Sequence, residues 1–342
     1  MAEGTKGVRM KQARKKMLLA LTLLAFTSLP VLSSQRITLM VGGIDKIIYL
    51  PAKLAEQLGY FSDEGLDVEL RSEWSGIHGV DVLLVGTVQG VVGFYDHTVY
   101  MQANGKAVVS VIQFAQAPGE VELVSTRVPS SVHSMADLKG CMLGVTGLGS
   151  STQFLTRYLV LSAGLKLNQV TFLPVGTGNS FIDAMKGGSI SAGMTTEPTA
   201  SRMLDARQAR VLVDLRTPED CERALGGPYP ASCLYLQTAW VNQHKPEVQK
   251  LVNALVKALR YIQSHTAAEI AAHVPAEFYA GDKSTYIKAL ARSKPIFIPD
   301  GRMPAKGPAN VLRVLTRTEK ALQGKAIDLG STYTLEFVNQ AR

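Results

Sequence analysis

Short apolar runs that lead into glycine-rich loops recur along this chain and constrain its fold more strongly than any other feature. In the first part of the chain these runs cover residues 37–41, 66–70, 88–94 and 108–114. Segments with the apolar spacing of helices separate them, and Gly59 and Gly105 mark where two of those helices end. A run that is apolar throughout is typical of a parallel strand buried on both faces. The alternation therefore predicts an α/β chain with a mostly parallel sheet and helices on both faces.

The same order starts again after Pro118-Gly119. Apolar runs then cover residues 120–125, 141–146, 170–175, 189–194 and 211–215, with helical segments between them. Ser134 and Asp137 have the spacing of a capping box for a short helix within this part. We predict a second α/β unit that is built like the first without being a sequence repeat of fixed period.

The segment after Cys233 adds one strand and then mainly helices. Pro246 opens a long helix, and the residues that form its apolar face are Val248, Leu251, Val252, Leu255, Leu259 and Ile262. Further helices are expected over residues 283–292 and 305–322. The first unit alone has too few helices to cover both faces of its sheet, so we expect the chain to return to it. We therefore predict lobe 1 from residues 35–117 and 232–342, and lobe 2 from residues 118–231.

The net charge of +8 is concentrated at the N-terminus. Residues 1–34 carry six basic side chains against Glu3, and the remainder holds 30 basic and 27 acidic residues, a difference of +3. A chain that near to balance lacks the dense basic surface that a duplex-binding protein needs. We predict no nucleic-acid partner.

Residues 1–34 have the order of a secretory signal peptide. A basic run ends at Lys16, residues 17–32 are almost entirely apolar, and Ser33 and Ser34 follow. This run is short for a membrane span, so we expect cleavage near residues 33–35 and a soluble periplasmic protein. The alternative is an uncleaved membrane anchor.

The three cysteines, Cys141, Cys221 and Cys233, form no cluster with histidines, so we predict no metal site. Cys221 and Cys233 flank a loop rich in glycine and proline, and export would permit a disulfide. The sequence leaves open whether they form one. Cys141 begins an expected strand, where we predict a small buried side chain.

Polar loops follow the expected strands of both units. Because ligands of open α/β sheets lie beyond the carboxyl ends of the strands, these loops are the candidates for a binding site. They cover residues 42–45, 74–76, 95–98, 147–152, 176–178 and 195–197.

The loop Gly147–Thr152 (GLGSST) is the strongest single signal, because it precedes a helix. Free N–H groups and a partial positive charge at a helix N-terminus, together with hydroxyl donors, can hold an anion without a basic side chain. The simpler interpretation is that Ser150 or Ser151 only caps the helix. The loop matches neither a P-loop nor a dinucleotide fingerprint.

Several single residues leave two interpretations open. Asp96 and His97 could form an acid/base pair, but no nucleophile accompanies them, so we expect contact with a ligand and predict no catalytic residue. Trp74 is either an apolar wall of the site or a buried anchor. Glu197 could bind a ligand amine, pair with a basic side chain across the cleft between the lobes, or do neither. Lys46 either faces the site or is solvated.

Three stretches carry a resemblance to a known family: residues 49–70 (YLPAKLAEQLGYFSDEGLDVEL), 137–154 (DLKGCMLGVTGLGSSTQF) and 175–198 (VGTGNSFIDAMKGGSISAGMTTEP). In order and spacing they resemble the substrate-binding proteins of nitrate/sulfonate/taurine ABC importers. The same superfamily includes binding proteins and enzymes for thiamin pyrimidine precursors. The resemblance implies a two-lobed periplasmic-binding-protein type II fold, with two doubly wound sheets joined by two hinge strands.

The resemblance also implies a monomer that captures a small solute without a cofactor. The protein would deliver this solute to a permease and an ATPase, and it would contact the membrane only through the permease. The loop at residues 94–98 departs from the small Ser/Thr-rich loop of sulfonate binders, which argues against a sulfonate and favours a larger or more polar ligand, such as an aromatic or heterocyclic one. The solute that we predict is a small organic molecule, either anionic or heterocyclic. An enzyme of thiamin-pyrimidine metabolism is the alternative, although its Cys-rich motif is absent. A sensing domain tethered by an uncleaved N-terminus is a third hypothesis.

The ligand-binding residues that we predict on these grounds come from the loops of both units. They are Gly43, Ile44, Asp45, Lys46, Trp74, Ser75, Gly76, Tyr95, Asp96, His97, Gly149, Ser150, Ser151, Thr152, Gly178, Thr196 and Glu197.

Overall fold

The computed structural model describes residues 36–342. The predicted signal peptide and its cleavage region lie outside these residues. Within residues 36–342 no helix is both long enough and apolar enough to span a membrane.

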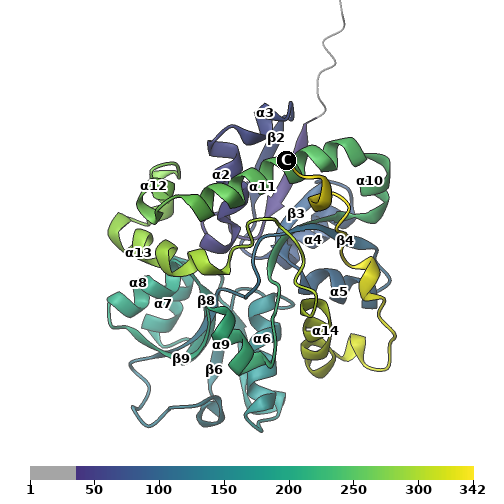
Figure 1. Ribbon diagram of the computed structural model, residues 1–342. Coiled ribbons are helices and arrows are strands. Elements are labelled where there is room, and N and C mark those ends of the chain that lie inside the picture. Colours follow the sequence, from purple (N-terminus) through teal and green to yellow (C-terminus); the bar gives the residue numbers. More distant parts are fainter. Residues whose placement is uncertain (1–35) are drawn as a thin grey trace, which may run out of the picture. The chain divides into compact units, whose positions relative to one another are not determined.

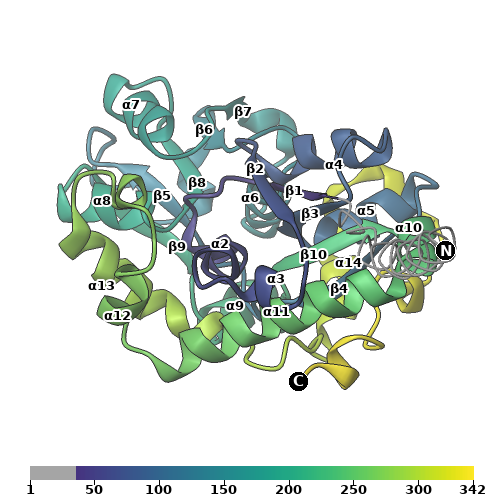
Figure 2. The same ribbon diagram turned by 90° about the horizontal axis from the view of Figure 1, so that it is seen from above.

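The first sheet has the strand order β2-β1-β3-β10-β4. β2, β3 and β4 are labelled in Figure 1, and all five strands are labelled in Figure 2. Its strands are β1 (Ile37–Val41), β2 (Val68–Ser72), β3 (Gly90–Phe94), β4 (Val108–Gln113) and β10 (Ser232–Gln237). β1 is parallel to β2 and β3, whereas β10 lies antiparallel between β3 and β4. β10 thus returns the chain to the sheet that it left after β4.

The second sheet repeats this arrangement with the order β7-β6-β8-β5-β9. Its strands are β5 (Glu120–Ser125), β6 (Met142–Val145), β7 (Thr171–Pro174), β8 (Ala192–Thr196) and β9 (Ala209–Leu215). β6 is parallel to β7 and β8, and β5 is antiparallel to β8 and β9. In both sheets the antiparallel strand is the one that the chain forms directly after crossing from the other sheet. The mostly parallel sheets predicted from the apolar runs are confirmed.

Helices connect the strands in the expected order. Those of the first half are α2 (Leu50–Gln57), α3 (Tyr60–Asp63), α4 (Gly76–Leu84), α5 (Asp96–Ala103) and α6 (Ser151–Ser162). α7 (Asn179–Gly187), α8 (Thr199–Asp205) and α9 (Pro218–Leu225) complete the second sheet's connections. The capping box at Ser134 is present and opens a short 3-10 helix, Met135–Leu138.

The C-terminal third is mainly helical, as the sequence indicates. It contains α10 (Thr238–Gln243), α11 (Lys245–Ser264), α12 (Ala267–Ala271), α13 (Lys283–Ser293) and α14 (Gly307–Thr318). The predicted apolar face of α11 is buried, and Figure 2 shows α11 running along α2 and α3. α13 and α14 also contact helices of the second sheet, α8 and α6 respectively.

Two crossings of the chain join the sheets and lie side by side. Residues 114–119 lead from β4 to β5, and residues 216–231 lead back from β9 to β10. Ala231 N donates to Ala115 O at 3.0 Å, and Gly119 N donates to Leu215 O at 3.1 Å. Paired segments of this kind can bend together, which is what a hinge between two lobes requires.

All three cysteines lie in the described part of the chain and are free thiols, so the disulfide that the sequence allowed is absent. Cys221 is buried on α9, where its thiol donates to Gly227 O at 3.4 Å. Cys233 is buried within β10, between two neighbouring strands. Each thiol packs as a small core side chain instead of facing the other. Cys141 precedes β6 and is half-buried, so the prediction of a fully buried side chain is wrong.

Candidate functional site

Loops from both sheets meet at a small cavity. Its lining residues are Lys46, Ile48, Tyr49, Gly76, Phe94, His97, Glu120, Thr146, Ser150, Ser151, Thr152 and Thr196. The volume that the centre of a water molecule can occupy in this cavity is about 10 Å³. The cavity therefore has room for about one water. Seven of the seventeen predicted residues line it: Lys46, Gly76, His97, Ser150, Ser151, Thr152 and Thr196.

Asp96 and Ser151 join the two sides of this cavity. Ser151 Oγ, at the start of α6, donates to Asp96 Oδ1 at 2.9 Å, and Tyr229 OH donates to Asp96 Oδ2 at 2.9 Å. Burial raises the pKa of Asp96 to about 7, although both hydrogen bonds oppose this shift. Both oxygens of the Asp96 carboxyl group thus accept a hydrogen bond, and the bond from Ser151 links the loops of the two sheets.

In the GLGSST loop the structure shows the capping role, while anion binding stays a prediction. Ser150 caps α6, since its Oγ accepts a hydrogen bond from Gln153 N. Thr152 Oγ1 accepts from Thr146 N at 2.9 Å, while its side chain lines the cavity. Gly149 has φ of +80°, a conformation that side chains rarely adopt. The N-terminus of a twelve-residue helix therefore opens directly at the cavity.

Lys46 faces the cavity and is not solvated, because only 5% of it is exposed. Its Nζ donates to Gly42 O at 2.6 Å and to Trp74 O at 3.3 Å. Burial lowers the pKa of Lys46 to about 8. Next to it, Ile47 N donates to Glu197 O at 3.0 Å, a second link between the sheets.

His97 is buried and neutral. Burial lowers its pKa to about 3, and its Nδ1 lies 3.2 Å from Tyr235 OH. Nε2 has no hydrogen-bond partner within residues 36–342, although it lies 3.8 Å from Asp96 Oδ1. Glu120 Oε2 and Thr196 Oγ1, on the same cavity wall, are also buried without a partner in this part of the chain. Buried polar atoms are nearly always hydrogen-bonded, so these three point to a polar ligand.

Other predicted residues lie beside the cavity or away from it. Trp74 is 56% exposed and stacks on His78, with ring centroids 5.1 Å apart. Tyr95 is buried, and its hydroxyl bonds to Thr332 in the C-terminal segment. Glu197 is 1% exposed and pairs with Arg216 at 2.8 Å. Because Glu197 follows β8 and Arg216 follows β9 of the same sheet, this ion pair does not cross the cleft between the lobes as that interpretation expected. The remaining predicted residues, Gly43, Ile44, Asp45, Ser75, Gly149 and Gly178, lie in the adjoining loops.

Sequence reasoning missed Glu120, which lines the cavity from the first position of β5. A signal was present, because Glu120 and Glu122 alternate with apolar residues in a strand that is buried on both faces. Acidic residues are almost never fully buried unless they are paired or functional. Ile48, Tyr49, Phe94 and Thr146 were missed because nothing in their local sequence sets them apart from core residues.

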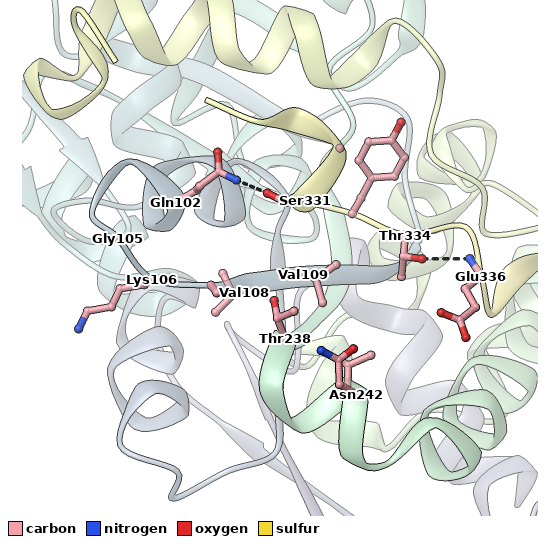
Figure 3. Close-up of a pocket in the computed structure, with 14 residues that line it drawn as sticks. Gln102, Gly105, Lys106, Val108, Val109, Thr238, Asn242, Ser331, Thr334 and Glu336 are labelled. Atoms are coloured by element: carbon pink, nitrogen blue, oxygen red, sulfur yellow. Dashed lines mark hydrogen bonds between the residues drawn. The ribbon is translucent and has the colours of Figure 1, made fainter. Parts of the chain in front are cut away.

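A larger cavity, of about 390 Å³, lies along β4 on the first sheet (Figure 3). α10 and the C-terminal segment form its other walls, and Glu336 N donates to Thr334 Oγ1 at 3.1 Å beside it. None of the predicted residues lines it. It lies at the amino end of β4, which is not the edge where α/β sheets bind ligands.

No group of three or more His, Cys, Asp or Glu side chains within residues 36–342 is arranged to hold a metal ion. The cavity between the loops of the two sheets instead gathers hydroxyls, an imidazole, one carboxyl group and one ammonium. Such a set can bind a small polar molecule through hydrogen bonds.

Comparisons with known proteins identify the family and the fold. The profile of the family described as NMT1/THI5 like matches residues 49–268. A solved structure from Bordetella bronchiseptica RB50 is 33% identical, with a TM-score of 0.85 over 89% of this chain and 96% of its own. The periplasmic nitrate-binding protein NrtA from Synechocystis PCC 6803 is 13% identical, with a TM-score of 0.73 over 90% of this chain and 88% of its own.

Two further matches extend the comparison. The desulfurization enzyme DszB is 17% identical, with a TM-score of 0.57 over 89% of this chain and 98% of its own. The nitrate import ATP-binding protein NrtC of Synechococcus elongatus is 24% identical over 243 residues, which are 67% of this chain. The chain spans only 36% of that relative's length.

Proposed function

Because this chain belongs to the NMT1/THI5-like family, we propose that it is the solute-binding component of an ABC importer. Its fold is the two-lobed type II fold of periplasmic binding proteins. In this proposal, residues 35–117 with 232–342 form one lobe and residues 118–231 the other. The lobes close over a small solute and release it unaltered.

The observation that carries the proposal is the cavity that loops of both sheets share. Buried polar atoms on its wall have no partner among the described residues, and they come from both sheets: His97 Nε2 from the first, Thr196 Oγ1 from the second. A ligand that bonded to both would stabilise the closed arrangement. Since the cavity holds about one water as it stands, entry of a solute requires the rims to separate by bending at the paired crossings.

Partners and location are part of the same proposal. NrtC is an ATP-binding protein of nitrate import, which supports a permease and an ATPase as the partners of this chain. NrtA is a periplasmic protein, which supports export of this chain; cleavage near residues 33–35 is part of the proposal. In this proposal the solute is small and organic, either anionic or heterocyclic.

A thermal-shift screen of the purified, exported protein tests the function. The panel contains nitrate, alkanesulfonates, aromatic carboxylates and pyrimidines. One-site binding stabilises the protein by about 2.7 kcal/mol at a hundredfold excess over Kd. The Ser151→Ala/Thr152→Ala double variant weakens an anionic solute by about 1–3 kcal/mol. Unchanged affinity in that variant would remove the GLGSST loop from the site.

The similarity to DszB supports one alternative, an enzyme on the same scaffold. Incubation of the protein with each stabilising compound, followed by mass spectrometry, separates the two. Recovery of the intact compound supports a binding protein, whereas conversion to product would favour the enzyme.

A further inference from the structure

Glu120 lines the cavity from an unusual position. The role that we infer for it rests on the proposed solute-binding function. It is the first residue of β5, directly after the crossing from the first sheet, and is 2% exposed. Its Oε2 is buried and has no hydrogen-bond partner among residues 36–342. The side chain lines the same cavity as Lys46, His97 and Ser151.

The charged groups around Glu120 come from several elements. Asp96 and His97 face it from α5, Lys46 from the loop after β1, and Glu122 from its own strand. Burial raises the pKa of Glu120 well above its usual range; Asp96 and Glu122 add to this shift and Lys46 opposes it. Near Glu120 there is thus one ammonium group, that of Lys46, and there are three carboxyl groups: Glu120, Asp96 and Glu122.

Lys46 has only one N–H donor left for a solute. Two of its three N–H donors are directed to Gly42 O and Trp74 O. The other groups at the wall that can donate to a solute include the hydroxyl of Thr196 and the N-terminus of α6. His97 Nε2 joins them in the tautomer in which Tyr235 OH donates to Nδ1 and not to Gly76 O.

An ionised Glu120 would repel the anion that these donors fit, whereas a protonated carboxyl adds one more donor. We propose that Glu120 is a ligand-binding residue that carries a proton in the closed site and donates it in a hydrogen bond to an anionic oxygen of the solute. The proton comes from solvent and stays on the Glu120 carboxyl, so no bond in the solute is made or broken. A carboxylic acid kept neutral by an apolar site donates a hydrogen bond to an oxyanion in the same manner in ketosteroid isomerase.

Infrared difference spectroscopy of the whole exported protein tests this directly, with nitrate, methanesulfonate and benzoate as probes. We expect the C=O stretch of a protonated carboxyl that shifts on addition of an anion and is lost in Glu120→Gln. Glu122→Gln is the matched control, because Glu122 is also buried on the same face of β5 but bonds to Thr156 and does not line the cavity. Glu122→Gln should remove a different band and leave the anion-dependent shift in place.

Calorimetry of the same proteins gives an independent measure. The amide of Glu120→Gln still donates a hydrogen bond, so its Kd for the anion should stay close to that of the unsubstituted protein between pH 6 and 8. Glu120→Leu removes the donor and should raise Kd by about tenfold, the equivalent of one buried hydrogen bond. Melting curves of both variants establish that they fold. If Glu120→Gln does not fold, the Glu122→Gln and Asp96→Asn proteins assign the shifting band by elimination.

Three results would overturn the proposal: an ionised Glu120 in the complex, equal Kd values in Glu120→Gln and Glu120→Leu, or binding of only neutral pyrimidines. The last result would leave the solute-binding function standing, since a solute would still be captured. Failure of every compound to bind, or its conversion to product, would count against the function itself.

Discussion

Ser151 Oγ donates a 2.9 Å hydrogen bond to Asp96 Oδ1, and so joins the first residue of α6 to the first residue of α5. The two helices follow strands of different sheets, and both side chains are buried. This bond is therefore a direct link between the two halves of the cavity.

Ser151→Ala should lower the free energy of unfolding by about 1–3 kcal/mol, because a buried carboxyl group loses one of its two side-chain donors. Urea unfolding at neutral pH measures the change. Ser162→Ala, an exposed position on the same helix, is the control and should change stability by less than about 0.5 kcal/mol. Equal effects of the two substitutions would show that the link contributes nothing.

Arg216→Met should be more damaging, because it leaves Glu197, only 1% exposed, without its cationic partner. Breaking one side of a buried ion pair typically costs about 3–5 kcal/mol. Adding Glu197→Gln removes the buried charge and should restore part of that loss, which a double-mutant cycle in urea would measure.

Arg223→Ala provides the comparison for this pair. Arg223 is 72% exposed and pairs with Asp220, and a surface ion pair contributes at most about 1 kcal/mol. A loss in Arg216→Met no larger than that in Arg223→Ala would contradict the structural role of the buried pair.

The strands and helices were predictable because their signals are local. The buried face of α11 follows from apolar residues three and four positions apart, and the cap at Ser134 follows from a spacing of three residues. The positions of β10 and β5 as antiparallel strands were not predictable, because apolar runs carry no information about direction.

The details of the site depend on tertiary contacts, which sequence spacing does not reveal. Glu197 meets Arg216 because β8 and β9 both flank β5, and not because of any motif around either residue. Glu120 reaches the cavity because β5 follows directly on a crossing between the sheets. Loops at the carboxyl ends of strands could be identified as candidates, but which of their side chains face the cavity could not.

The free cysteines make a prediction about chemical reactivity. Burial raises the pKa of the Cys221 and Cys233 thiols, that of Cys221 to about 12, and the thiolate is the reactive form. In the folded protein, iodoacetamide should therefore modify half-buried Cys141 first. In denaturant without reductant, mass spectrometry should find all three thiols modified. Detection of a single modified thiol under those conditions would instead indicate a disulfide.

Because of Lys46, the protein should become more stable as the pH rises through the alkaline range. A lysine paired with a carboxylate has the opposite effect. Burial lowers its pKa from 10.5 to about 8 in the folded protein. Below about pH 8 both the folded and the unfolded states bind the proton, and the buried charge is then destabilising. Between about pH 8 and 10.5 only the unfolded chain holds it, so the free energy of unfolding rises with pH.

The difference in unfolding free energy between the unsubstituted protein and Lys46→Met should therefore grow by about 3 kcal/mol across this interval. Urea unfolding of both proteins at several pH values between 7 and 10.5 measures it, and exposed Lys283→Met controls for the loss of a lysine as such. Titrating groups that do not interact with Lys46 are common to both proteins, so their contributions cancel in the difference. A difference that stays flat or falls as the pH rises would mean that Lys46 keeps its proton in the folded state, and that the cavity holds a permanent positive charge.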